Sequence, residues 1–237
     1  EVVFNEDSAD IDFRVESDGN ANMLFVDGGN NRVGIGTASP SNQLHLESAT
    51  STTMLMKNTG NSGSQIDGDA NRSSADSTIM GIVGKWNGTS VADMLIVSGA
   101  DTTHKDDGEI VFRTAPSGTL GERMRITSGG NIGIGESSPL ATLHVKQADS
   151  GASVHGSADQ LAIENSSNAG LSILSGTSGE GAVYFGDSGD NDIGRVRYNH
   201  SDNSMDFKTN ASVAMTIDSS GNVGIGTTSP QTVGGGK

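Results

Sequence analysis

The stretch NVGIGTTSP at residues 222–230 decides the fold, because it is the last of three copies of one pattern. The earlier copies read NRVGIGTASP at 31–40 and NIGIGESSP at 131–139. Each copy follows a turn rich in Gly and Asn, continues as apolar-Gly-Ile-Gly, and closes with polar residues and Ser-Pro. Three of the chain's four prolines stand in these copies. The rest of the chain is therefore interpreted as material spaced between them.

The alternating glycines give the motif an unusual face. In an extended chain Val33 and Ile35 point one way, while Gly34 and Gly36 point the other and leave that side without side chains. Glycine inside a strand often marks the close approach of another backbone. We expect a second copy of the same chain to pack there, and the proline to end the ladder because it has no N–H to donate.

The motif is therefore interpreted as a crossover between modules, with an ordinary glycine-rich hairpin as the alternative. The structural crossover residues are Gly34, Gly36, Pro40, Gly133, Gly135, Pro139, Gly224, Gly226 and Pro230.

The closing prolines divide the chain into repeats. We expect the end of a partial repeat over 1–40, full repeats over 41–139 and 140–230, and a Gly-rich tail over 231–237. The units are longer than the common solenoid repeats of about 20–50 residues. Each repeat is therefore expected to be a small module of several strands.

Strand is the expected structure nearly everywhere, because apolar and polar residues alternate over short runs bounded by Gly, Asn, Asp and Ser. Shared strands are expected at 13–15, 23–27, 44–46, 54–58, 109–114, 122–127, 143–145, 161–165, 205–208 and 213–218. The polar stretches 60–78 and 99–108 are expected to be long loops. The predicted fold class is all-β, an elongated repeat fibre of short-stranded β modules and an intertwined homotrimer.

Composition excludes several classes of function. The net charge of -15 argues against nucleic-acid binding and against attraction to an anionic membrane surface. The absence of Cys removes disulfides and thiolate chemistry. No run approaches the roughly 20 apolar residues of a membrane helix. Because the chain begins at Glu1 without an apolar leader, we expect a fragment or a processed product.

The apolar content also bears on assembly. Leu, Ile, Val and Phe make up about one fifth of the chain, which is close to the level at which a charged chain fails to fold alone. Either the core is narrow, or each chain completes its core with other copies of itself.

The third motif and the segment before it, MTIDSSGNVGIGTTSP at 215–230, resemble the repeats of bacteriophage tail fibres and tailspikes. The resemblance covers the motif copies and the strands that lead into them. In that family the motif often stands ahead of a C-terminal intramolecular chaperone domain, a self-cleaving Ser/Lys protease, and no such domain follows Pro230 here. The resemblance implies an elongated β-rich homotrimer at the virion that recognises the host.

Three groups of residues are candidates for metal binding. His45 and His144 sit between aliphatic residues in strands, where a trimer axis can hold a metal, although a solvent-facing His is favoured. Asp67, Asp69 and Asn71 have the spacing of the first Ca²⁺ ligands of an EF-hand loop, but Arg72 replaces the turn glycine. Asp187, Asp190 and Asp192 form a second acidic turn. Polar surface turns explain both acidic stretches more simply, so no metal or cofactor is expected.

No catalytic residues stand out. The Gly-Ile-Gly pattern is no dinucleotide fingerprint, because Pro closes it and no helix follows. Trp86, Tyr184 and Tyr198 are the receptor-contact candidates, since aromatic side chains anchor sugars and proteins. Trp86 stands at an expected hairpin tip, Trp86-Asn87-Gly88-Thr89. The alternative, that each ring fills the core of its module, is slightly favoured.

The sequence thus predicts a structural and receptor-binding segment of a phage tail fibre that mediates host attachment and has no enzymatic activity. Its expected partners are two further copies of the chain and a host surface glycan or outer-membrane protein, with no nucleic acid and no membrane insertion. The loops at 60–78 and 99–108 are its expected contact surfaces. A bacterial surface adhesin or extracellular filament subunit is the first alternative, and a tailspike-like glycan depolymerase is the second.

Overall fold

A computed structural model describes residues 11–231. All regular structure in this range is β, in three open sheets, which confirms the predicted all-β class. None of the described residues belongs to a helix that is long and apolar enough to cross a membrane. The chain divides into two compact units, Glu1–Asp67 and Gly68–Lys237, and each is described by itself.

The first unit contains a four-stranded sheet in the order β1-β2-β3-β4. Its strands β1 to β3 are antiparallel neighbours, whereas β4 lies parallel to β3. The strands are β1 Phe13–Ser17, β2 Asn20–Asp27, β3 Arg32–Ile35 and β4 Leu44–Leu46.

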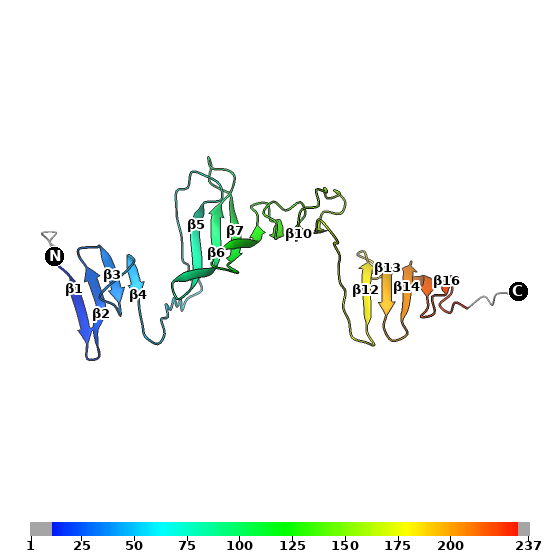
Figure 1. The fold of residues 1–237 in the computed structure, drawn as a ribbon, viewed down its shortest axis with the longest axis horizontal. Helices are drawn as coiled ribbons and strands as arrows, with labels where there is room; N and C mark the ends of the chain where they lie inside the picture. The colour runs from blue at the N-terminus through cyan, green and yellow to red at the C-terminus, as the bar shows by residue number, and fades with distance from the viewer. Residues whose placement is uncertain (1–10, 232–237) are drawn as a thin grey trace. The chain divides into compact units, whose positions relative to one another are not determined.

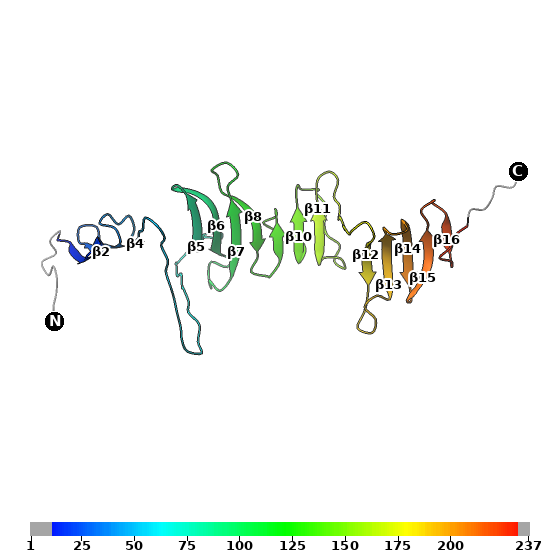
Figure 2. The same cartoon turned by 90° about the horizontal axis from the view of Figure 1, so that it is seen from below.

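The second sheet has seven strands in the order β11-β10-β9-β8-β7-β6-β5 and lies in the second unit. Figure 2 shows them side by side in chain order. From β5 to β9 the neighbours are antiparallel, and from β9 to β11 they are parallel. The strands are β5 Thr78–Trp86, β6 Thr89–Ser98, β7 Gly108–Thr114, β8 Gly121–Ile126, β9 Ile132–Ile134, β10 Leu143–Lys146 and β11 Leu161–Glu164.

The third sheet, also in the second unit, is a five-stranded antiparallel meander in the order β12-β13-β14-β15-β16 (Figure 1). The strands are β12 Glu180–Phe185, β13 Gly194–Asn199, β14 Ser204–Thr209, β15 Ser212–Ile217 and β16 Val223–Ile225.

The three motif copies form the equivalent strands β3, β9 and β16. A tight turn precedes each strand, and a side-chain oxygen at its start accepts an amide. Asp27 Oδ1 accepts the amide of Asn30 at 2.8 Å, and Asp218 Oδ1 accepts that of Asn222 at 2.9 Å. The turns include residues at positive φ, such as Asn31 (57°). Asn and Gly tolerate this conformation, which explains the composition of the turn.

The motif glycines meet their own chain. A β-carbon on Gly34 would overlap the carbonyl oxygen of Thr37, and one on Gly133 would overlap that of Glu136. The backbone therefore turns back onto the bare face, where we expected a second chain. Gly36 lies beyond the end of β3 at φ 84°, so it does not extend the alternation of the strand.

The same turn explains the polar residue that follows the glycines. The side chains of Thr37, Glu136 and Thr227 each accept the amide two residues ahead, at 3.3, 2.6 and 3.2 Å. This local bond holds the chain in the turn that brings the carbonyl over the glycine.

The loops at 60–78 and 99–108 have the expected irregular structure until β5 and β7 begin. The expected strand at 54–58 is wrong, although the matching segment forms β11. Met54 and Leu55 are exposed and have no neighbouring strand among the described residues, so hydrogen bonds and packing do not hold them extended. The predicted boundary at 40/41 falls inside the first sheet, and the tail 232–237 lies outside the described residues.

Each sheet has one face built from apolar side chains, which we call the apolar face. In the second sheet two rows of paired residues cross all the strands without interruption. The first row is Ile82, Met94, Phe112, Met124, Ile134, Val145 and Ile163, and the second is Met80, Ile96, Ile110, Ile126, Ile132, Leu143 and Leu161.

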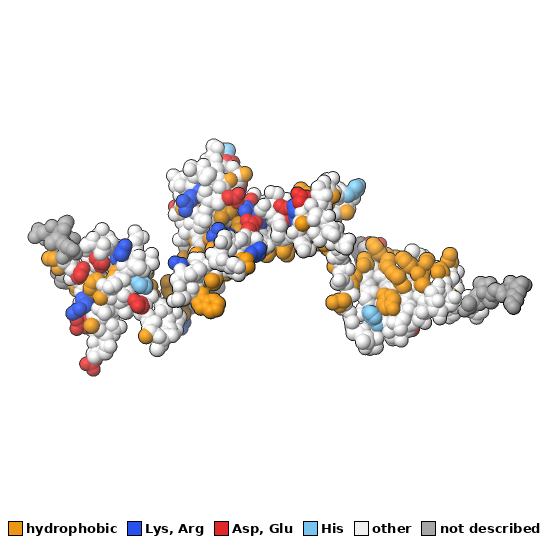
Figure 3. All heavy atoms as spheres, in the orientation of Figure 1, with side chains coloured by type: hydrophobic (Ala, Val, Ile, Leu, Met, Phe, Trp, Pro, Cys, Tyr) orange, Lys and Arg blue, Asp and Glu red, His pale blue; other side chains and the backbone are white. Residues whose placement is uncertain are grey.

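The third sheet repeats this arrangement, and Figure 3 shows hydrophobic side chains gathered over β12–β16. Its rows are Val183, Val196, Phe207, Met215 and Ile225, then Gly181, Tyr198, Met205, Ile217 and Val223. The first sheet contributes the row Phe13, Val26, Val33 and Leu44. Many of these residues are exposed, including Ile82 at 61% and Val183 at 44%.

The opposite faces carry charged pairs. Asp93, whose side chain is 2% exposed, accepts two bonds from Arg113 at 2.9 and 2.6 Å. Asp206 accepts bonds from Arg195 at 3.2 Å and from Arg197 at 2.6 Å. The small buried core of Leu95, Val97 and Val111 also lies on this side of the second sheet.

Candidate functional site

The structure brings the two predicted contact loops together. Residues 69–72 and 101–107 line a hollow of about 370 Å³ beside β5 and β6. Asp69, Asn71, Lys105 and Asp107 supply charged and polar groups to its wall. The sequence predicted each loop separately, but nothing in the sequence showed that they share one hollow.

Hydrogen bonds hold the wall of the hollow. The carboxylate of Asp107 accepts the amide of Asp101 at 3.1 Å, and Asp101 accepts the amides of Thr103 and His104 at 2.8 and 3.0 Å. The bond from the His104 amide, together with that from its ring, keeps the pKa of Asp101 below its usual value of 3.8. These bonds hold the loop in one conformation, in which carboxylate, ammonium and amide groups line the hollow.

The calcium candidate has a different arrangement from an EF-hand loop. The Nζ of Lys105 donates to Asn71 Oδ1, so an ammonium already uses an oxygen that a Ca²⁺ ion would need. Arg72, in place of the turn glycine, donates through Nε to the carbonyl of Thr78 at 2.6 Å.

The second acidic turn is held by its own backbone. Asp187 accepts the amides of Gly189 and Asp190 at 2.7 and 3.0 Å, which lowers its pKa below 3.8. Asp192 is paired with Lys208 at 2.8 Å. These contacts match the interpretation of this stretch as a polar surface turn.

The three aromatic candidates are all accessible. Trp86 ends β5 and is 79% exposed, and the turn after it has positive φ at Asn87 (47°) and Gly88 (82°), as expected for a hairpin tip. Tyr184 is 53% and Tyr198 38% exposed. None of the three rings is buried in the single chain over the described residues, so the alternative that each ring fills the core of its module stays a prediction for the trimer.

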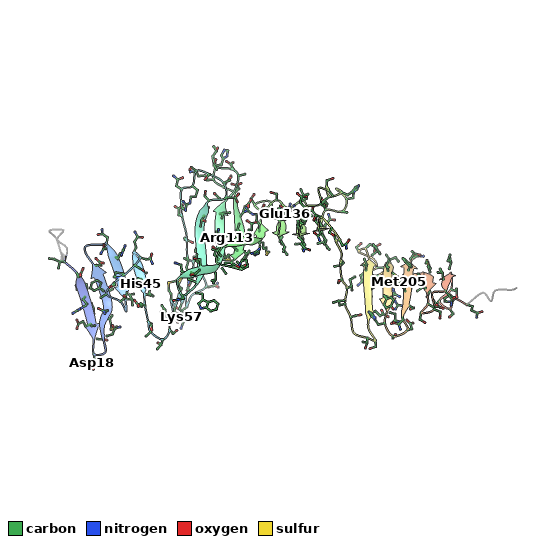
Figure 4. The ribbon with its side chains drawn as sticks, in the orientation of Figure 1. Asp18, His45, Lys57, Arg113, Glu136 and Met205 are labelled. Atoms are coloured by element: carbon green, nitrogen blue, oxygen red, sulfur yellow. The ribbon has the colours of Figure 1, made fainter. Side chains whose placement is uncertain are left out.

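Tyr184 and Tyr198 lie on opposite faces of the third sheet. Tyr198 stands in an apolar row opposite Met205, which Figure 4 labels, whereas Tyr184 pairs with Arg195 on the charged face. Tyr198 also donates to Asn203 Oδ1 at 3.2 Å. Tyr184 thus projects away from the apolar face of the third sheet, while Tyr198 belongs to it.

The two strand histidines have a structural role that the sequence reasoning missed. His144 is 1% exposed, so the prediction that it faces solvent is wrong. Its Nδ1 accepts the amide of Leu140 at 3.4 Å, and His45 Nδ1 accepts that of Ser41 at 3.3 Å. Both amides belong to the residue after the motif proline. The shared spacing from Pro to His was the signal for this contact.

A charged cluster surrounds His144. Its Nε2 lies 2.9 Å from Glu164 Oε2, and Lys146 Nζ lies 2.5 Å from Glu136 Oε2 (Figure 4 labels Glu136). Ser150 donates its amide and hydroxyl to Glu164 at 2.6 and 2.7 Å, and these bonds lower the pKa of Glu164 from 4.5 to about 2. The bond from Lys146 likewise lowers the pKa of Glu136.

Glu136, His144 and Glu164 are also the one group within residues 11–231 whose ligand atoms lie close enough for a metal ion. The ammonium of Lys146 already neutralises two carboxylates of this group, at 2.5 and 3.8 Å. The cluster therefore fits a structural ion-pair network that ties β10 to β11 and to the turn after β9. His144 lies on the face opposite the apolar rows, because it pairs with Gly133 and Ala162.

Comparison with known proteins gives a limited result. No protein-family model and no curated protein matches the chain. Among solved structures, the carboxy-terminal domain of the bacteriophage T5 L-shaped tail fibre is 13% identical with a TM-score of 0.35, over 78% of this chain and 94% of that one. The same domain with its intra-molecular chaperone domain is 12% identical with a TM-score of 0.39, over 77% and 64%. At these scores the likeness carries no argument about function.

Proposed function

We propose that the chain is a structural and receptor-binding segment of a bacteriophage tail fibre that works as a homotrimer outside the cell, on the virion. The observation that carries this proposal is the exposed apolar face of each sheet, with two unbroken apolar rows across the second sheet. A soluble protein rarely leaves such a surface open, and a wide apolar patch marks an interaction site.

The exposure of the apolar rows supports self-association, since Ile82 is 61% and Val183 is 44% exposed. Apolar and polar residues alternate along the strands, as they do in a sheet that is covered on one face. Three copies that turn their apolar faces toward a common axis would cover the rows and leave the charged faces in solvent.

The repeated motif supports the tail-fibre assignment, through its resemblance to the repeats of phage tail fibres and tailspikes. The net charge of -15 and the ion pairs on the outer faces fit a surface that stays in solution. The contact groups for a host glycan or outer-membrane protein would be Trp86, Tyr184 and the hollow at 69–72 and 101–107. No enzymatic step is part of this proposal.

Sedimentation equilibrium at micromolar concentration tests the assembly. The expected mass is about three times the 24.2 kDa of the chain. A monodisperse folded monomer would refute the proposed trimer. Binding of the labelled trimer to a panel of bacterial cells and purified surface glycans then tests attachment. Release of oligosaccharide from a glycan in that panel would instead favour a depolymerase.

A further inference from the structure

The first sheet has one strand fewer after its motif than the second sheet has. In the second sheet β10 pairs with β9 and, on its other side, with the parallel strand β11. Among residues 11–231, β4 pairs with β3 alone. The stretch MLMKN at 54–58 corresponds to LAIEN at 161–165, which contains β11. The chain therefore has a counterpart of β11, but in the single chain this segment forms no strand.

The side chains of β4 are less covered than those of β10. His144 is 1% exposed beside β11, whereas the equivalent His45 is half-buried. Leu44 is 56% exposed, while the equivalent Leu143 is half-buried. In the segment itself Leu55 is 79% exposed. Both β4 and the segment thus keep open the side chains that a strand pair of this kind covers.

The charges at the ends of the two strands are complementary. In the second sheet Lys146 stands opposite Glu164, and Lys146 Nζ lies 3.8 Å from Glu164 Oε2. The equivalent positions of the first repeat are Glu47 and Lys57, which Figure 4 labels. The signs are exchanged, so the register of β10 and β11 would again place opposite charges side by side. A solvent-exposed pair adds little stability, but like charges in another register would oppose pairing.

The same register extends the apolar face of the first sheet. In the second sheet β11 continues both apolar rows beyond β10. In the equivalent register Met54 would stand beside Leu44, and Met56 beside Leu46. The row that ends at Leu44 would then gain a further member on the same face.

The connection within one chain is short for this pairing. Parallel neighbours are joined by eight residues, 135–142, between β9 and β10, and by fourteen, 147–160, between β10 and β11. Only six residues, 48–53, separate Glu47 from Met54. A connection between parallel neighbours must run back along the strand, which usually takes a dozen residues or more. The short connection favours a partner strand from another copy.

We propose that residues 54–57 of one copy add as a parallel strand to β4 of a second copy, on the side away from β3. The register pairs Leu44 with Met54 and Glu47 with Lys57. This inference rests on the proposed homotrimer. Each copy gives one strand and receives one, so backbone hydrogen bonds at the sheet edge link the three chains, in addition to their apolar faces.

The natural chain has no Cys, so introduced cysteines can report this contact. The full chain with Glu47→Cys and the full chain with Lys57→Cys are co-expressed with distinct affinity tags. Both positions are exposed in the single chain. Neighbouring strands lie about 4.8 Å apart, within the range that a disulfide spans. Oxidation of the mixed trimer should give a covalent dimer that carries both tags, at least about tenfold more than either variant gives alone.

The matched control replaces Lys57→Cys by Asn61→Cys, which lies about 13 Å further along an extended segment and should form little covalent dimer with Glu47→Cys. Equal yields from the two pairs would overturn the proposal. A chain that carries both Glu47→Cys and Lys57→Cys should link to its neighbours, and a disulfide closed within one chain would also overturn it.

Sedimentation equilibrium of each mixture separates this inference from the proposed function. A trimer that forms no bond between positions 47 and 57 would overturn the strand exchange and leave the trimer standing. A folded monomer would refute the trimer, and the strand exchange with it.

Discussion

The carbonyl oxygen of Glu136 occupies the place where a β-carbon on Gly133 would stand. Thr37 has the same relationship to Gly34 in the first copy. The motif therefore packs against its own chain. The turn that follows the motif strand lies over the strand glycine and then leads into the parallel strand.

The substitution Gly133→Ala should destabilise the fold. The added carbon must displace backbone and not a flexible side chain, so we expect the free energy of unfolding to fall by about 3 kcal/mol. Urea denaturation of the full chain measures this. Gly63→Ala is the control, because a β-carbon there meets nothing within 4 Å. Equal denaturation midpoints for the two variants would contradict the close packing of the turn on Gly133.

The substitution Ile82→Asp should dissociate the proposed trimer, because it places a charge in an apolar row. The neighbouring Val83 is exposed too but points to the other face, opposite Asp93. Val83→Asp should therefore keep a mass of about three chains, while Ile82→Asp should sediment at the mass of one, 24.2 kDa. Trimers of both variants would show that this face is not the interface.

Acid should loosen the cluster around His144 through Glu164. The pKa of Glu164 is lowered from 4.5 to about 2, so the folded state favours the ionised carboxylate. Its contribution to stability is present above pH 4.5 and is lost as the pH falls toward 2. Glu164→Gln should be less stable than the natural chain at pH 7, and the difference should shrink across that interval.

Denaturation midpoints at pH 7, 4, 3 and 2 follow this change. The variant Glu47→Gln, at an exposed position, serves as the control and should track the natural chain at every pH. A constant difference between Glu164→Gln and the natural chain over the whole range would show that ionisation of Glu164 does not contribute.

The substitution Asp206→Asn should cost more stability than Glu180→Gln, although both contact Arg197. The Asp206 side chain is 4% exposed and serves two arginines, whereas that of Glu180 is 41% exposed. Removal of the buried charge takes the carboxylate from Arg195 and leaves Arg197 with Glu180 alone, at a cost of about 3 kcal/mol. The exposed pair should contribute below about 1 kcal/mol. Similar unfolding curves for the two variants would argue against this ranking.

Trp86 should report receptor contact, because it is the chain's single tryptophan and stands at an exposed hairpin tip. Binding of a receptor there should shift its fluorescence and reduce quenching by acrylamide. Trp86→Ala should weaken attachment at least tenfold and leave the sedimentation mass unchanged. Full attachment by this variant would remove Trp86 from the contact surface.

Local patterns in the sequence were enough to predict most strands. The turn residues at 28–31 and 219–222 tolerate positive φ, and short alternating runs then give strands on either side. The segment 54–58 shows the limit of this reasoning. Its Met and Leu residues resemble those of β11, but a strand forms only where a neighbouring strand supplies hydrogen bonds, and that partner is a tertiary fact.

The candidate site was predicted only in pieces. The aromatic residues and the two loops were named from composition, yet their exposure and their shared hollow depend on where the sheets place them. His144 was assigned to solvent because alternation separates it from its aliphatic neighbours. Alternation assigns His144 to one face of its strand but does not show what covers that face. The parallel pairing of β10 with β11 places Glu164, 20 positions later, against His144.

The sequence by itself determined the all-β class, the three equivalent motif strands and the position of the turns, because glycine, asparagine and proline act through local backbone geometry. Only the tertiary structure decided what meets the bare glycines and which residues align into apolar rows. These properties depend on register between strands, and register brings together residues that are distant in the chain.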